Sequence, residues 1–291
     1  MKNNDMKGAY RVAHELLRDR LKDKAPEILQ ELDEIMESDV IITRGQHDYI
    51  EKVMQQAGTP YTLLDPVEIE GANLRPDQIV FVNCPGNFSS KGIRNLVHFV
   101  HEGGFLFTTD WALKHVLEPA FPGVVEYNGQ ATGDEVVRVE VLDKEDPFLA
   151  SILDSEDDPQ WWLEASSYPI RILDSERVKV LVTSRELGER YGESPVFITF
   201  DHGKGTVYHM ISHFYLQRVE TRTQRHMGSS FEYMAQKGIS PQTMNKYSAM
   251  GAGEMNVSEV ESAYVSRGMM SRVMWEKRVQ IKKMDSKKRR K

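Results

Sequence analysis

Cysteine is almost absent from this sequence, because Cys84 is the only one among 291 residues. An intramolecular disulfide is therefore excluded, and a metal site built from several thiolates is excluded as well. A lone cysteine is typically a small buried hydrophobic residue, and the alternative for Cys84 is a free thiol near a turn. We expect no cofactor and no metal centre.

Long hydrophobic runs are also missing. No stretch reaches the roughly 20 apolar residues that a membrane span needs, and the first ten residues, MKNNDMKGAY, lack the apolar segment of a secretory signal. We therefore expect a cytoplasmic protein with no membrane partner. At 40% hydrophobic residues, the chain has enough apolar side chains for one large domain.

The charge balance limits the partners that the protein can have. The formal net charge of −7 argues against wholesale nucleic-acid binding. Residues 275–291 differ, since they hold nine Lys or Arg against two Asp or Glu, a net charge of +7 that leaves −14 on the rest. A basic tail of this kind is typical of a solvated, disordered end, and the alternative is weak contact with phosphates or an acidic partner.

Residues 78–118 carry the most information, because they predict a strand, a tight turn, a helix, a second strand and a second sharp turn into a helix. The apolar run Ile79 to Asn83 stops at Pro85-Gly86, and Phe105 to Thr108 leads into Thr109-Asp110-Trp111. Catalytic α/β proteins place a nucleophile on such an elbow. Neither Ser nor Cys stands there in this sequence.

These residues resemble the class I glutamine amidotransferase-like superfamily, including ThuA-like proteins and the amidotransferase-like domain of intraflagellar transport proteins. The segment Pro195 to Phe200, followed by His202 to His213, is similar to the strand pair near the end of those domains, and the resemblance covers residues 39–236. It implies an elbow cysteine with a histidine and a carboxylate after the last strand. Here Asp110 occupies the elbow, His213 matches the histidine, and Tyr215 stands where the carboxylate would be, so amidotransferase chemistry is not expected.

The predicted fold is α/β, a three-layer sandwich with a mostly parallel central sheet of the flavodoxin-like or amidotransferase-like kind, plus helical extensions at both ends. A Gly-containing hairpin, 196–211, is expected to add antiparallel strands at one edge. Four parts follow from the pattern. They are an N-terminal helical extension (1–38), the α/β domain (39–237), a linker rich in Gly, Ser, Met and Asn (238–256), and a C-terminal amphipathic helix with the basic tail (257–291).

The two extensions are amphipathic. Residues 9–36 have helical spacing with a break at Pro26, and 257–281 have it again, with Ser258 and Glu261 in register for a capping box. Such helices favour a protein partner or self-association through the N-terminal helices and residues 257–281. The alternative for the C-terminal helix is that it folds back on its own domain.

The cleft predicted at the sheet end has three candidate catalytic residues, namely Asp110 as nucleophile or base, His213 as proton carrier, and Cys84. Each has a structural alternative: Asp110 as the N-cap of the following helix, His213 as a structural hydrogen-bonding residue, and Cys84 as a buried side chain. Candidate ligand-binding residues for a small molecule are Pro85, Gly86, Asn87, Thr109, Asp110, Trp111 and His213, with the amides near Gly86-Asn87 as an oxyanion site.

Other histidines and tryptophans give weaker signals. His98 and His101 lie three apart on a predicted helix, and His209 and His213 lie four apart on a strand, but neither pair predicts a metal site without further ligands. Core packing is expected for at least two of Trp111, Trp161 and Trp162.

Two functions remain. The first is a non-enzymatic, amidotransferase-like binding or assembly module that contacts partners through its terminal helices. The second is a small-molecule hydrolase or sugar-metabolism enzyme that uses Asp110 and His213.

Overall fold

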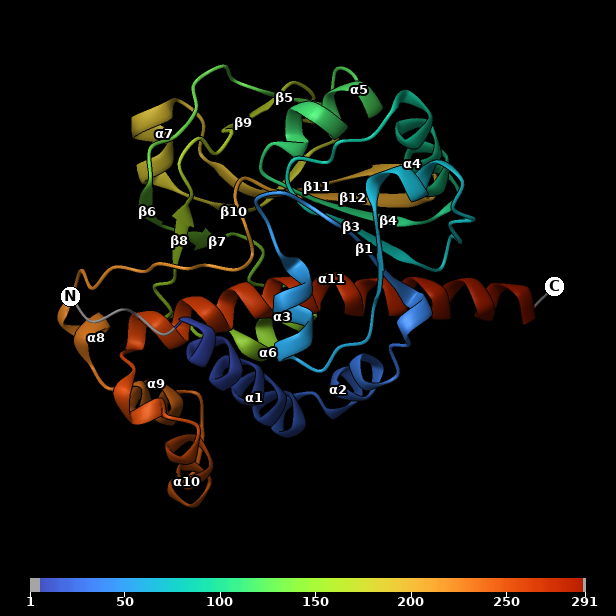
Figure 1. The fold of residues 1–291 in the computed structure, drawn as a ribbon. Coiled ribbons are helices and arrows are strands. Elements are labelled where there is room, and N and C mark those ends of the chain that lie inside the picture. Colours follow the sequence, from blue (N-terminus) through green and yellow to red (C-terminus); the bar gives the residue numbers. More distant parts are fainter. Residues whose placement is uncertain (1–5, 290–291) are drawn as a thin grey trace.

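The computed structural model describes residues 6–289 (Figure 1). Its centre is an eight-stranded sheet in the order β2–β1–β3–β4–β12–β11–β10–β7, accompanied by two small two-stranded sheets, β5–β9 and β6–β8. The strands are β1 (Val40–Thr43), β2 (Thr62–Leu64), β3 (Ile79–Val82), β4 (Phe105–Thr109), β5 (Val125–Tyr127), β6 (Glu135–Arg138), β7 (Glu140–Val141), β8 (Gln160–Leu163), β9 (Ile170–Ile172), β10 (Lys179–Thr183), β11 (Pro195–His202) and β12 (Gly205–Met210).

Helices cover both faces of this sheet. In Figure 1, α4 and α5 lie above it, and the long α11 runs beneath it with α1 and α2 further below. The α-helices are α1 (Met6–Lys24), α2 (Pro26–Asp33), α3 (Ile50–Gln56), α4 (Ser90–Glu102), α5 (Glu118–Ala120), α6 (Pro147–Ile152), α7 (Arg185–Tyr191), α8 (Gln224–Met227), α9 (Ser230–Gln236), α10 (Pro241–Ala249) and α11 (Val257–Arg289), and the short η helices are η1 (Glu37–Asp39), η2 (Pro66–Glu70), η3 (Leu113–Leu117) and η4 (Ala252–Glu254).

The sheet is parallel on one side and antiparallel on the other. Its pairings from β2 to β12 are parallel, and those from β12 through β11 and β10 to β7 are antiparallel. An α/β protein with a large, mixed central sheet and helices on both faces is therefore confirmed, whereas the flavodoxin-like detail stays a prediction. The expectation that hairpin 196–211 lies at an edge is wrong, because β12 pairs directly with β4 in the interior of the sheet.

Local hydrogen bonds and close contacts explain how residues 78–118 form helix α4 and strand β4. Ser89 caps α4 by accepting hydrogen bonds from the N–H groups of Lys91 and Gly92, at 3.2 and 3.3 Å. The helix ends at Gly103, whose φ of 129° suits glycine. A Cβ on Gly104 would lie 2.2 Å from the Phe99 ring, so glycine is needed where β4 starts beneath the helix. All five residues of β4 are buried, as their apolar run predicts.

The polar and apolar residues of 135–142 alternate, which predicts one strand, yet the stretch is divided between two sheets. β6 pairs with the Trp-containing β8, whereas β7 forms the far edge of the main sheet beside β10. Between them, the N–H of Val139 donates to the carbonyl of Pro159 at 3.1 Å. The apolar alternation is the same in both halves, so it could not reveal the change of partner.

The N-terminal helices follow the prediction, with α2 beginning at Pro26 in its first turn. Tyr10 of α1 is fully buried, and its hydroxyl donates to the carbonyl of Phe214 and accepts from the N–H of Leu216 at 2.9 Å. Helix α1 is thereby fixed to the segment that directly follows His213.

Helix α11 folds back on its own chain, which is the alternative to a partner contact that the sequence left open. Buried serines allow close approach: Ser266 donates to the carbonyl of Phe214 at 2.7 Å, and Ser262 accepts from the N–H of Gln160 at 3.1 Å. The capping box begins two residues earlier than predicted, since the side chains of Asn256 and Glu259 bond each other's backbone N–H. Ser258 and Glu261 do not form the capping box that their spacing predicts, and both side chains are buried.

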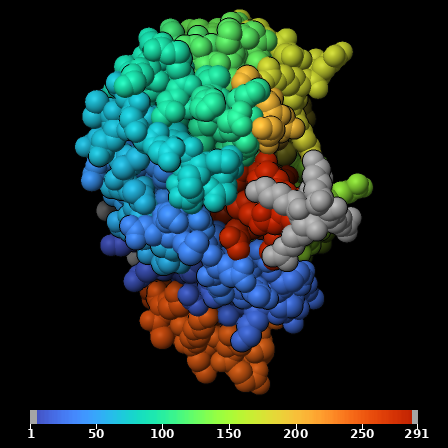
Figure 2. All heavy atoms as spheres, turned by 90° about the vertical axis from the view of Figure 1, so that its right-hand side faces the viewer, coloured from blue at the N-terminus to red at the C-terminus, as the bar shows by residue number. Residues whose placement is uncertain are grey.

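The basic end is helical as far as Arg289, so the expectation of a disordered tail is wrong for its described part. Figure 2 shows this end of α11, in red, emerging between N-terminal residues in blue and residues coloured cyan. Arg278 pairs with Glu34 at 2.8 Å, and Lys277 donates to the carbonyl of Gly103 at 2.6 Å. Residues 290–291 lie outside the described residues.

Residues 238–256, expected as a linker, contain α10 and η4. Ser240 caps α10 by accepting from the N–H of Thr243 at 3.3 Å, and Pro241 occupies the first turn. Tyr247 is buried and donates to Asp19 of α1 at 2.6 Å. A composition rich in turn residues thus conceals a short helix, while the division of the chain into four parts stays a prediction. Among residues 6–289 there is no helix with the length and apolar character that crossing a membrane requires.

Candidate functional site

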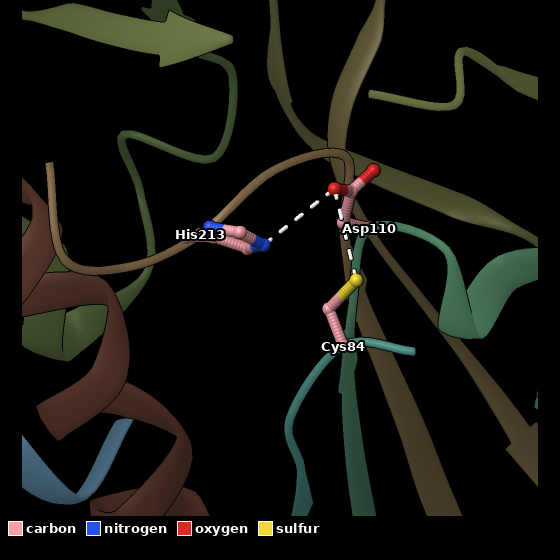
Figure 3. Close-up of side chains that lie close together, drawn as sticks. All are labelled: Cys84, Asp110 and His213. Atoms are coloured by element: carbon pink, nitrogen blue, oxygen red, sulfur yellow. Dashed lines mark hydrogen bonds and ion pairs between the residues drawn. The ribbon is translucent and has the colours of Figure 1, made fainter. Parts of the chain in front are cut away.

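Cys84, Asp110 and His213 come together at the carboxyl end of the parallel strands (Figure 3). Cys84 follows β3, Asp110 follows β4, and His213 lies three residues beyond β12, which pairs with β4. The Sγ of Cys84 lies 3.9 Å from Oδ2 of Asp110, and Nε2 of His213 lies 3.5 Å from the same oxygen. Parallel pairing brings these ends to one edge, which is where open α/β sheets place ligands.

Asp110 stands on a strained turn. Its φ is 49°, in the left-handed region, which costs a residue other than glycine about 1–3 kcal/mol. The turn closes with a hydrogen bond of 2.9 Å from the N–H of Leu113 to the Asp110 carbonyl, and the chain continues into η3.

The alternative that Asp110 caps the following helix is wrong. Helix η3 has no side-chain cap, and Oδ1 of Asp110 instead accepts from the N–H of Tyr168 at 3.1 Å. The other carboxylate oxygen, Oδ2, faces His213.

His213 lies between two carboxylates. Its Nδ1 is 2.6 Å from Oε2 of Glu164, while Nε2 faces Asp110. The imidazole is 3% exposed, and both contacts are ion pairs without the alignment of a hydrogen bond. Such alignment is often completed only when substrate binds.

A further carboxylate lies beneath the elbow. Oδ2 of Asp48 accepts from the hydroxyl of Thr109 at 2.7 Å, and Oδ1 accepts from the N–H of Tyr49 at 2.7 Å. Asp48 is buried, so its charge acts on the site through a medium that screens it weakly. The Thr109 hydroxyl therefore already has a hydrogen-bond partner in Asp48.

The surroundings change the pKa of all three clustered groups. Burial raises the pKa of Asp110 to about 7, although the charge of His213 opposes this. Burial lowers the pKa of His213, but the charge of Asp48, the contacts with Cys84 and Glu164, and the charge of Asp110 outweigh it, so the pKa lies well above 6.5. Burial raises the pKa of the Cys84 thiol to about 11. At neutral pH, His213 therefore carries a proton, Asp110 can exchange one, and Cys84 is a thiol, not a nucleophilic thiolate.

A cavity of about 190 Å³ opens on this cluster. One wall is Trp111, whose indole N–H donates to the carbonyl of Ser166 at 2.7 Å and whose ring stacks on Tyr168 with centroids 5.5 Å apart. The lining residues are His47, Cys84, Asp110, Trp111, Glu164, Ala165, Ser166 and His213.

Of the predicted site residues, four line this cavity: Cys84, Asp110, Trp111 and His213. Pro85, Gly86, Asn87 and Thr109 do not line it. Gly86 is buried, and a Cβ at this position would lie 2.5 Å from a methyl group of Val116. Asn87 is exposed and lies outside the cavity lining. The suggested oxyanion site at Gly86-Asn87 thus has no support from the cavity.

Sequence reasoning missed Glu164, Asp48 and His47. A usable signal existed for two of them: Glu164 directly follows the apolar run of β8, and Asp48 lies in the turn after the first parallel strand. Polar residues at such strand ends are candidates for a site.

The remaining histidines do not join the cluster. His209 is fully buried, its Nδ1 lies 2.8 Å from the Thr108 hydroxyl, and burial lowers its pKa to about 3. Within residues 6–289, the group with three potential metal ligands is Cys84, Asp110 and His213, with ligand atoms within 4.8 Å of one another. His98 and His101 do not belong to it.

The tryptophans divide as expected. Trp161 is fully buried, and Trp162 is buried with its indole N–H donating to Asp134 at 2.7 Å, so both serve packing. Trp111 is the one at the cavity.

No protein-family model matches this chain, and no curated protein matches it in sequence. Among solved structures, an exo-β-1,4-mannosidase from Opitutaceae bacterium strain TAV5 is similar with a TM-score of 0.40 and 12% identity, over 75% of this chain and 36% of its own. A ThuA-like protein from Bacteroides uniformis gives 0.42 and 12%, over 60% and 80%. A cytoplasmic protein from Salmonella typhimurium gives 0.43 and 10%, over 75% and 99%.

The chain spans about a third of the length of the mannosidase. A ThuA-like protein is among the structures that this chain resembles, yet likeness at these scores carries no argument about function. Membership of the amidotransferase-like superfamily therefore stays a prediction.

Proposed function

We propose that this protein is a small-molecule hydrolase in which Asp110 acts as general base and His213 as general acid. The observation that carries the proposal is the position of Asp110. Its carboxylate stands on a strained strand-to-helix elbow, faces the His213 imidazole at 3.5 Å, and borders a cavity. A strained, buried, ion-paired carboxylate is costly for stability, which favours a functional role.

The two groups have complementary proton states. Asp110, with a pKa near 7, can accept a proton from a water molecule as the water oxygen forms a bond to the reacting carbon. Protonated His213 donates its Nε2 proton to the leaving group as the bond to that group breaks. The proton then returns from Asp110 to Nε2 across 3.5 Å, which restores the starting state.

Glu164 and Cys84 support this pair. Glu164, 2.6 Å from Nδ1, orients the imidazole and stabilises its positive charge. The Cys84 thiol donates weakly to Asp110 and holds the carboxylate in place. The cavity of about 190 Å³ suits a small substrate, such as an ester, an amide or a glycoside.

The test is turnover of a panel of 4-nitrophenyl esters, anilides and glycosides by the full chain. Asp110→Asn and His213→Ala should each lower kcat by at least about 10²-fold, because each removes one proton-transfer group. Asp201→Asn, which changes an exposed carboxylate on the β11–β12 hairpin, is the matched control and should keep full turnover.

Thermal melts of all variants must be recorded alongside. The proposal fails if no substrate in the panel is turned over, or if both variants lose activity only in proportion to folded protein. Turnover that a chelator removes and zinc restores would instead make the cluster a metal site.

The hypothesis of a binding module without catalysis has less support. It relies on the terminal helices meeting a partner, whereas the apolar faces of α1 and α11 pack against each other and their own chain. A partner would have to use the remaining polar surfaces of these helices. Light scattering of a chain with exposed α11 charges reversed, for example Lys283→Glu, would detect such an assembly by a fall in mass.

A further inference from the structure

A second cavity, of about 110 Å³, lies among helices α1, α2 and α11 and the loop after α3. It shares no lining residue with the sheet-end cavity. Most of its wall is aliphatic, and the polar residues gather where α1 meets α11. The lining consists of His14, Leu17, Arg18, Leu21, Leu29, Leu32, Asp33, Ile35, Ala57, Gly58, Thr59, Pro60, Arg267, Ser271 and Met274.

Among residues 6–289, no carboxylate pairs with the buried Arg267. The residue is 4% exposed, and within this range it donates one hydrogen bond, from Nη2 to the Thr59 hydroxyl at 3.2 Å. Its Nε and Nη1 have no acceptor among the described residues. An unpaired buried charge is expensive, so proteins seldom keep one without a use for it.

The other buried arginines show what is missing. Arg20 lies 2.7 Å from Asp154, and Arg272 lies 2.9 Å from Asp146. In the Arg267 cavity the one carboxylate of the wall, Asp33, is already bound in bidentate fashion by Arg18, at 2.5 and 3.1 Å. No carboxylate is therefore left for Arg267 within residues 6–289.

Two more polar groups at the cavity have no hydrogen-bond partner among the residues that the structure describes. Nδ1 of His14 and the hydroxyl of Ser271 are buried without a hydrogen bond. Burial, together with the charges of Arg267 and Arg18, lowers the pKa of His14 to about 3, so His14 is neutral at pH 7. Burial lowers the pKa of Arg267 to about 10, so Arg267 still carries its charge at that pH. Neutral His14 and Ser271 can each donate a hydrogen bond to an anion.

We propose that this cavity binds a short-chain aliphatic carboxylate, with its carboxylate on Arg267, His14 and Ser271 and its hydrocarbon part against the leucines of α1 and α2. A planar guanidinium matches a planar carboxylate. Within the described part of the chain, Arg267 is the cation of this wall that has no carboxylate, which suits one negative charge, whereas phosphate brings more charge and needs more donors. The volume equals roughly four water molecules at about 30 Å³ each, which suits acids of the size of propionate.

The experiment measures thermal unfolding of the full chain in potassium propionate against potassium chloride of equal ionic strength, with isothermal titration calorimetry at one temperature. Propionate should raise Tm by at least about 2 °C and saturate, since it binds the folded state. Propionamide, which is uncharged, and inorganic phosphate should give no such shift.

Three variants test whether the propionate shift in Tm arises from binding in this cavity. Arg267→Met should abolish the propionate shift and leave the ligand-free Tm equal to or above that of the parent chain. Leu29→Phe, which fills the cavity without changing charge, should abolish the shift as well. Arg278→Met removes the same charge from α11 outside the cavity and should keep the shift.

The proposal is overturned if the parent chain shows no saturable shift with propionate, if phosphate or propionamide acts as strongly, or if Arg267→Met or Leu29→Phe retains the shift. It does not depend on the proposed hydrolase activity, so either can fail alone.

Discussion

The two cavities differ in how their buried charges are balanced. At the sheet end, His213 stands between Asp110 and Glu164 with Asp48 below, so positive and negative groups meet within the chain. Between the helices, Arg267 stands without a carboxylate among residues 6–289. Groups of opposite charge in contact can pass a proton among themselves, whereas a buried cation without a carboxylate needs an anion from outside the chain. The cost of burying a charge therefore favours proton transfer in the sheet-end cavity and anion binding in the cavity between the helices.

The largest expected effect is a difference in the free energy of unfolding between two variants, one of a buried arginine with a carboxylate partner and one of a buried arginine without such a partner among residues 6–289. Arg272→Met leaves Asp146 and Glu276 without their cation and should lower the free energy of unfolding by about 3–5 kcal/mol. Arg267→Met removes a charge that no carboxylate of residues 6–289 neutralises, and it should leave this free energy unchanged or raised. Urea unfolding of both variants decides the matter, and equal losses would remove the distinction between the two arginines.

The next effect concerns the balance at His213. Glu164→Gln removes the charge beside Nδ1 and should lower kcat about 10²-fold with little change in KM, because His213 is less stable in its protonated form. The upper limb of the pH–rate profile should move to lower pH for the same reason. Glu189→Gln, which breaks an exposed ion pair with Arg185, is the control. An unchanged pH profile would rule out this role for Glu164.

Stability against pH provides a smaller test of the same cluster. Because the folded-state pKa of Asp110 is raised from 3.8 to about 7, the folded protein holds a proton that the unfolded chain releases between these values. Stability from this group should therefore fall as pH rises through that window, by at most about 1.4 kcal/mol per pH unit. Urea unfolding at pH 5 and pH 7 should show a shallower fall for Asp110→Asn than for the parent chain. Parallel slopes would contradict the raised pKa.

The smallest effect is expected at the thiol. Cys84→Ala removes a weak hydrogen bond to Asp110 and should lower turnover no more than about fivefold, in line with a net worth of about 1 kcal/mol. Iodoacetamide should label Cys84 slowly at pH 7, since its pKa is raised to about 11. Rapid labelling or complete loss of turnover would make Cys84 the nucleophile.

The regular elements around the elbow were predictable because their signals are local. Buried runs gave β3 and β4, Ser89 and Gly103 delimited α4, and Pro26 marked the start of α2. Where partners had to be assigned, the prediction failed: hairpin 196–211 lies inside the sheet, and 135–142 serves two sheets. Spacing fixes which side chains are buried, but not which strand will bury them.

By itself the sequence determined an α/β chain with Asp110 on a sharp turn, Cys84 on the turn before it and His213 at a strand exit, because strand and turn preferences act over a few residues. The tertiary structure alone decided that Glu164 would contact His213 and that the charge of Asp48 would act on it, that Asp110 would not cap a helix, and that Arg267 would meet no carboxylate among residues 6–289. These outcomes depend on desolvation and on charges brought together from distant segments, which no local pattern records.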